Sequence, residues 1–197
     1  MPRAGLTEAR VVDEAERMSD ELGLARLTLA ALAERLGVRQ PSLYKHIDGM
    51  DALQRSLAVR AKTELASVLA RAAVGRERGD AIASLSHAYR AWALEHPGRY
   101  AAAQRAPAAG DADDQAASRA IVGIVADVLD GYELREDDAI DAIRAFRSTL
   151  HGFITLEAGG GFGLPVDIDR SFDQLVRGLI TALSEWAGQP ETEGSRA

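Results

Sequence analysis

The stretch from residue 28 to residue 53, TLAALAERLGVRQPSLYKHIDGMDAL, decides the fold because it reads as two short helices joined by a tight turn. Thr28 is placed to cap a first helix, whose apolar side chains recur at helical spacing. Gly37 ends that helix, since glycine readily adopts the positive φ found at many helix ends. Pro41 marks the start of a second helix, because proline is well tolerated in a first helical turn. The pattern predicts a helix-turn-helix followed at once by a longer helix.

The outward face of the second helix suits a DNA duplex. Leu43 and Ile47 lie four residues apart and face the core, which leaves six hydrogen-bonding side chains pointing outward: Arg39, Gln40, Ser42, Tyr44, Lys45 and His46. Arginine and glutamine reach base edges, whereas serine, tyrosine, lysine and histidine bind phosphate oxygens beside the groove. Spacing alone leaves a plain helical hairpin as an alternative, since short helix pairs with a glycine turn are common.

The segment resembles the N-terminal domain of the TetR family of bacterial transcription regulators. QPSLYKHI, from Gln40 to Ile47, is very similar to the DNA-recognition helix of that family. The resemblance implies that Thr28 contacts a phosphate, and Arg39, just before the helix, is expected to reach a guanine. The further contacts that it implies are Gln40, Pro41 and Ser42 near base edges, and Tyr44, Lys45 and His46 on the backbone and adjacent bases.

One position departs from the family pattern. TetR-like regulators usually place a lysine that contacts phosphate at the start of the next helix, and here that position is Met50. We therefore expect the salt dependence of DNA binding to be weaker by about one counterion per subunit than in relatives that keep the lysine.

Composition and charge limit the classes of protein that remain. The chain has 197 residues, 47% hydrophobic content and no cysteine, which excludes disulfides and thiolate metal sites. A formal net charge of −7 argues by itself against a nucleic-acid binder, because such domains are usually basic. Between Arg35 and Ile47, however, the chain has three cations and a histidine but no acid. The local charge therefore favours DNA.

Neither a membrane span nor a signal peptide is indicated. No stretch approaches the eighteen or so apolar residues that a spanning helix needs, and the first residues lack the apolar core of a signal peptide. We therefore predict a cytoplasmic bacterial protein without membrane contact.

Helical periodicity continues to the end of the chain, and no run alternates apolar and polar residues as a strand would. The sequence predicts an all-α protein of about nine helices, with a helix-turn-helix DNA-binding domain over residues 1–50. Residues 51–197 are expected to form a helical regulatory domain for ligand binding and dimerisation. The expected helices lie at about 7–22, 28–36, 40–47, 50–73, 80–96, 99–105, 115–129, 137–158 and 169–187.

The last predicted helix carries an apolar face that is sustained from Phe172 to Trp186 and needs a partner surface. Packing within the monomer is one solution. The resemblance to TetR regulators favours a homodimer in which the last two helices pair with their symmetry mates. The dimer contacts expected on this basis are Leu175, Leu179, Ile180 and Leu183.

The second half also resembles one branch of the family through YRAWALEHPGRY, residues 89–100, and FRSTLHGFITLE, residues 146–157. Aromatic and polar side chains gather in these helices, and we expect them to line a pocket for an apolar or aromatic small molecule. Each of them taken singly is more often a core residue. The candidate pocket residues are Tyr89, Trp92, Tyr100, Arg105, Phe146, His151 and Phe153.

Signatures of catalysis, metal binding and cofactor binding are missing. The four histidines show no metal-ligand spacing, and the glycines at 159–163 fit neither a P-loop nor a dinucleotide fingerprint. No catalytic residue, metal or cofactor is predicted. The sequence predicts a ligand-responsive repressor that binds a palindromic operator as a homodimer. The alternatives are an activator and a helical small-molecule-binding protein that retains the helix-turn-helix.

Overall fold

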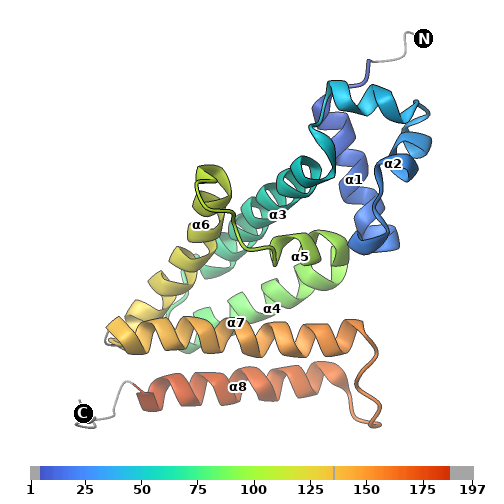
Figure 1. Ribbon diagram of the computed structural model, residues 1–197. Coiled ribbons are helices and arrows are strands. Elements are labelled where there is room, and N and C mark those ends of the chain that lie inside the picture. The colour runs from blue at the N-terminus through green and yellow to red at the C-terminus, as the bar shows by residue number, and fades with distance from the viewer. Residues whose placement is uncertain (1–4, 135, 187–197) are drawn as a thin grey trace, which may run out of the picture. The chain divides into compact units, whose positions relative to one another are not determined.

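The computed structural model describes residues 5–134 and 136–186 and is helical almost throughout (Figure 1). The chain runs through α1 (Glu8–Leu22), the 3₁₀ helix η1 (Leu24–Arg26), α2 (Leu29–Leu36), the 3₁₀ helix η2 (Gln40–Lys45), α3 (Gly49–Ala73), α4 (Arg78–Glu95), α5 (Pro97–Ala103), α6 (Ala112–Leu129), the 3₁₀ helix η3 (Asp130–Tyr132), α7 (Glu136–Ala158) and α8 (Ile168–Trp186). The described residues contain no strand, and the all-α prediction is confirmed. Every helix among them is too short or too polar to cross a membrane.

The two helix caps predicted in residues 28–53, called the reading segment below, are present. Thr28 Oγ1 accepts a hydrogen bond of 3.1 Å from the Ala31 amide, and Gly37 ends α2 with a φ of 68°. The expected second helix differs, because η2 has hydrogen bonds from Ser42 N to Arg39 O and from His46 N to Leu43 O, three residues apart. A helix this short has few places for bonds four residues apart, and Pro41 has no N–H, so the tighter winding prevails.

The chain divides into two compact units. The first contains the residues up to Val68 together with Ala91–Ile121, and the second contains Leu69–Arg90 together with the residues from Val122 onward. Three helices, α3, α4 and α6, each contribute to both units. This division follows compactness, and the functional boundary predicted at residue 50 stays a prediction.

The core of the first unit is built by α1, α2, η2 and the start of α3. Its buried side chains are Val11, Val12, Ala15, Met18, Leu27, Leu29, Leu32, Ala33, Leu43, Ile47, Leu53 and Leu57, joined by Ala102 of α5. Met50, the position where relatives usually have a lysine, is half-buried and packs against this core. The reading segment is thus held from behind by α1 and α3.

Helix α5 belongs to the first unit because it packs directly on α1. Gly98 makes this contact possible, since a Cβ atom at that position would lie 2.1 Å from the carbonyl carbon and oxygen of Ser19. No side chain could be accommodated there without moving one of the two helices. The backbone of α5 therefore lies against the C-terminal turn of α1.

In the second unit, α7 and α8 lie side by side and antiparallel (Figure 1). The apolar face of α8 is used within the chain, where Phe172, Val176, Leu179 and Leu183 are buried. Two of the four predicted dimer contacts, Leu179 and Leu183, therefore have little surface to offer a partner. Leu175 and Ile180 are half-buried, and Ile180 also lies beside Gly79 of α4.

Candidate DNA-reading surface

The exposed side of η2 forms the candidate reading surface. Leu43 is fully buried and Ile47 nearly so, which anchors η2, whereas the Tyr44 side of the helix faces outward with that residue 53% exposed. The predicted contacts divide by exposure: Thr28, Arg39, Gln40, Pro41, Tyr44 and Lys45 are exposed, and Ser42 and His46 are half-buried. The structure thus brings seven of the eight predicted DNA contacts together on or next to η2, with Thr28 at the start of α2.

The turn between the two helices explains this orientation. Arg39 caps η2 in an extended conformation, and Pro41 occupies the first turn. Beside the end of η2, a polar groove of about 390 Å³ is lined in part by Tyr44, Lys45 and His46 and in part by Arg55 and Ser56 of α3. The arrangement leaves hydrogen-bond donors of η2 exposed, as entry into a groove of DNA requires.

One of the three cations counted in the reading segment has another role. The Arg35 guanidinium lies 2.6 Å from a carboxylate oxygen of Glu14 and 2.7 Å from one of Glu21, both on α1. Its hydrogen bond holds the pKa of Glu21 below the usual range. Arg35 therefore ties α2 to α1, and the local charge argument made from the sequence rests on Arg39 and Lys45.

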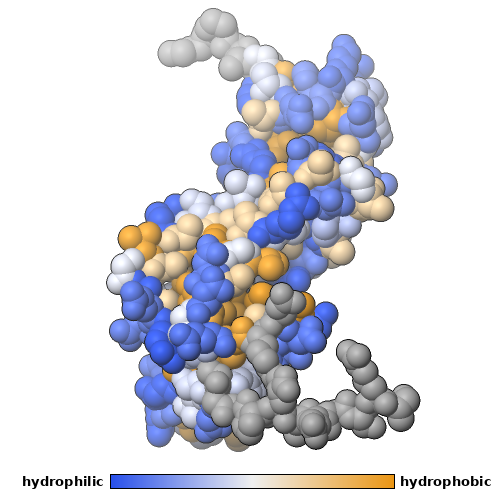
Figure 2. Space-filling model, turned by 90° about the vertical axis from the view of Figure 1, so that its left-hand side faces the viewer, coloured by the Kyte–Doolittle hydropathy of each residue, from blue (hydrophilic) through white to orange (hydrophobic). Residues whose placement is uncertain are grey.

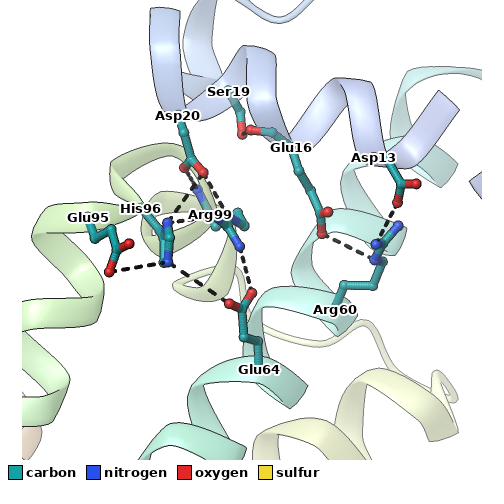
Figure 3. A network of polar contacts seen from close by, with 9 residues as sticks. All are labelled: Asp13, Glu16, Ser19, Asp20, Arg60, Glu64, Glu95, His96 and Arg99. Atoms are coloured by element: carbon teal, nitrogen blue, oxygen red, sulfur yellow. Dashed lines mark hydrogen bonds and ion pairs between the residues drawn. The ribbon is translucent and has the colours of Figure 1, made fainter. Parts of the chain in front are cut away.

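Acidic residues of α1 also form ion pairs with the helices packed around it (Figure 3). Arg60 of α3 pairs with Asp13 at 2.7 Å and with Glu16 at 3.2 Å, and Arg99 of α5 pairs with Asp20 at 2.7 Å. These carboxylates belong to α1 and bind the elements packed around it. Asp13, Glu16 and Asp20 are thus engaged in ion pairs with α3 and α5, as Glu14 and Glu21 are with α2.

Comparison with known proteins identifies the family. Residues 82–179 match the family model described as "Tetracyclin repressor-like, C-terminal domain". The HTH-type transcriptional regulator YobS of Bacillus subtilis is 39% identical over 184 residues, which cover 92% of this chain and 95% of YobS. The chain belongs to the TetR family of transcriptional regulators.

The chain is also similar to a curated tetracycline repressor over a short stretch and to a solved TetR structure in its fold. The tetracycline repressor protein class D of Escherichia coli is 41% identical over 56 residues, 28% of this chain and 26% of that protein. The solved structure of a TetR variant from Acinetobacter baumannii in complex with minocycline is 21% identical, with a TM-score of 0.71 over 94% of this chain and 100% of that one. The predicted family and the function of a DNA-binding transcriptional regulator are confirmed.

The candidate ligand residues of this TetR-family regulator are distributed over both units. Trp92, Tyr100 and Arg105 lie in the first unit, and the others, Tyr89, Phe146, His151 and Phe153, lie in the second. Four of the seven are buried, namely Tyr89, Trp92, Tyr100 and Phe146, while Arg105 is exposed and His151 and Phe153 are half-buried. Phe153 packs its ring against Phe162 and Phe172. The assignment of these residues to a pocket stays a prediction.

A buried ion pair in the first unit of the TetR-family chain was missed from the sequence. Lys62 of α3 is 3% exposed and Asp114 of α6 is fully buried, and their charged atoms lie 2.5 Å apart. The Lys62 ammonium also donates to the main-chain oxygen of Arg105 at 2.7 Å. The sequence offered one signal for this ion pair: among the 23 residues that are lysine or arginine, only Lys45 and Lys62 are lysine, which singles out Lys62.

Proposed function

We propose that this TetR-family regulator is a repressor that binds a palindromic operator as a homodimer and is released by a small-molecule inducer. The observation that carries the proposal is the geometry of η2, whose apolar residues are locked in the core while Tyr44 and its neighbours are exposed. A dimer would place two such helices in successive major grooves about 34 Å apart. The site of action would be the bacterial cytoplasm, where operator DNA lies.

The proposed division of labour on DNA follows from side-chain chemistry. Arg39, Gln40 and Ser42 would read base edges, with Pro41 close to them, because their groups match donors and acceptors in the major groove. Tyr44, Lys45 and His46 would bind the backbone and adjacent bases. Thr28 supports a phosphate contact, since its oxygen accepts from the Ala31 amide and its hydroxyl proton is still available to donate.

The proposed dimer uses the outer sides of α7 and α8. Figure 2 shows hydrophobic side chains gathered between hydrophilic ones on the lower half of one face. Of the exposed large apolar side chains of the second unit, Ile140 and Leu156 lie on α7, and Phe162, Leu164 and Val166 lie in the connection from α7 to α8. The other two, Val74 and Val122, lie outside these elements. Gly152 and Gly178 are also exposed on α7 and α8, and glycines allow two helices to approach closely. The proposed contact therefore shifts away from Leu179 and Leu183, leaving Leu175 and the exposed part of Ile180 from the predicted set.

The proposed inducer is an apolar or aromatic small molecule. The related TetR structure is a complex with minocycline, and in this chain the aromatic residues Tyr89, Phe146 and Phe153 of the second unit would offer a guest ring faces. In the first unit, Trp92 has a buried indole N–H without a hydrogen-bond partner among the described residues. Such a group would favour a guest with one hydrogen-bond acceptor.

The test is binding of the purified full-length protein to a fragment of its own upstream region, compared with random DNA at fixed salt. We expect a specificity ratio of about 10³ or more for the wild type and loss of that ratio in Tyr44→Ala. Arg119→Ala is the matched control, because Arg119 is exposed on α6 and belongs to neither the reading surface nor α7 and α8. Equal affinity of the wild type for both fragments, and for other fragments of the same genome, would refute the proposal.

A further inference from the structure

A polar cluster joins α5 to α1 around His96 (Figure 3). His96 lies between α4 and α5 with its side chain 16% exposed, and Arg99 follows one turn later. The Arg99 guanidinium donates to Asp20 of α1 at 2.7 Å and to Glu64 of α3 at 2.8 Å. Its backbone amide also donates to Asp20, at 2.9 Å. Arg99 is thus the side chain that holds α1, α3 and α5 together at this point.

The hydrogen bond between Arg99 and His96 assigns the protons of the imidazole. The Arg99 Nη2 atom lies 2.5 Å from His96 Nδ1. A guanidinium can only donate, so Nδ1 must accept, and the ring proton of a neutral His96 is on Nε2. That proton faces Glu95 at 3.8 Å and Glu64 at 4.0 Å. The observed contact therefore requires a neutral imidazole.

We propose that the α1–α5 contact is proton-sensitive, with His96 as the group that takes up the proton and Arg99 as the side chain that responds. Protonation would place a hydrogen on Nδ1, directly facing the guanidinium, so that two donors and two positive charges would meet at 2.5 Å. The hydrogen bond from Arg99 to His96 cannot survive this change. Histidine is the side chain whose charge ordinarily changes between about pH 5 and pH 8.

The charged groups around His96 decide which carboxylate a protonated ring would bind. The groups that face the ring are Asp20 of α1, Glu64 of α3, Glu95 of α4 and Arg99 of α5, with Glu16 of α1 near Arg99 and Glu64. Asp20 is the carboxylate nearest to Nδ1, at 3.8 Å, and it is also bound by Arg99. A charged His96 therefore competes with Arg99 for Asp20.

The close backbone contact between α5 and α1 limits how the two helices can move when His96 is protonated. Gly98 lies against the Ser19 carbonyl with no space for a Cβ atom, so α5 cannot shift toward α1. Movement of Arg99 must then be taken up by its partners Asp20 and Glu64. The C-terminal turn of α1, which also carries Glu21 and its link to Arg35 of α2, is the element that receives the change. The proton sensitivity of this contact depends on neither the operator nor the inducer.

The test is a pH titration of the full-length, ¹⁵N-labelled protein by NMR between about pH 8 and pH 5.5. We expect the His96 ring in the Nε2–H form at the alkaline end. The Arg99 Nε–H signal should then shift with the same midpoint as the His96 ring. His96→Gln keeps a side-chain oxygen that can accept from Arg99 but does not titrate, so the shift of Arg99 should disappear. His87→Gln is the matched control, because His87 is half exposed beside Asp173 in the second unit.

Trp92 provides a second measurement on the wild-type cluster. Its ring packs edge-on against His96 with centroids 5.6 Å apart, and Trp186→Phe makes it the one tryptophan of the chain. A protonated imidazole quenches indole emission, so Trp92 fluorescence should fall with the midpoint of His96. An Arg99 signal that stays constant while His96 titrates, or that still shifts in His96→Gln, would overturn the proposal. So would a Nδ1–H tautomer at alkaline pH.

Discussion

Replacing Gly98 by alanine should destabilise the protein, although alanine is the better helix former. A Cβ atom at this position would lie 2.1 Å from the Ser19 carbonyl carbon and oxygen and 2.6 Å from the Asp20 nitrogen. Carbon atoms in contact normally lie about 3.5–4.0 Å apart, so α5 and α1 would have to separate by roughly 1.5 Å. Helix propensity alone favours alanine by about 1 kcal/mol. Overpacking costs about 1–3 kcal/mol, and because the clash is with backbone we expect the upper end of that range, which leaves a net loss of about 2 kcal/mol.

The assay is urea unfolding of wild type and Gly98→Ala at one fixed protein concentration, because the proposed dimerisation would make apparent stability depend on concentration. Gly123→Ala is the matched control, since Gly123 lies within α6 and an added Cβ meets nothing within 4 Å. That variant should be as stable as the wild type or more stable. If Gly98→Ala is also as stable as the wild type, the close approach of α5 to α1 is wrong.

Three further predictions concern charge. Lys62→Met leaves Asp114 buried without its partner and should lower the free energy of unfolding by about 3–5 kcal/mol, while combining it with Asp114→Leu should recover most of the loss; urea unfolding checks both. The pKa of Asp111 is lowered by its hydrogen bond to Arg55, so this pair stabilises the fold above the unfolded pKa and the stabilisation is lost as pH falls through the lower folded pKa. The free energy of unfolding should therefore fall less in Asp111→Asn than in the wild type between neutral pH and a pH below 4, as urea unfolding at both pH values would measure. An equal fall in both proteins would show that the Asp111–Arg55 pair does not contribute this stability. Met50→Lys should steepen the salt dependence of operator binding by about one counterion per subunit, measured as log affinity against log salt, and an unchanged slope would show that residue 50 does not reach a phosphate.

Helix caps and helix boundaries depend on residues that are close together in the chain. The caps at Thr28 and Gly37 and the helix-turn-helix layout were predicted because capping and apolar periodicity are written within a few residues of one another. The winding of η2 was not predicted, because a segment containing Pro41 can close its short turns with either hydrogen-bond pattern. The boundaries of the longer helices agreed with the prediction to within a few residues for the same local reason.

The sequence by itself determined the all-α class, the reading segment and the membership of the TetR family, since each depends on residue order over short stretches. Only the tertiary structure decided the roles of single side chains. Arg35 was counted as a cation for DNA until the fold brought Glu14 and Glu21 of α1 against it. Packing of α8 buries Leu179 and Leu183 within the chain, and their place at a dimer contact stays a prediction. A helical pattern tells which side chains share a face but not what that face meets, because ion pairs and close packing join residues far apart in the chain.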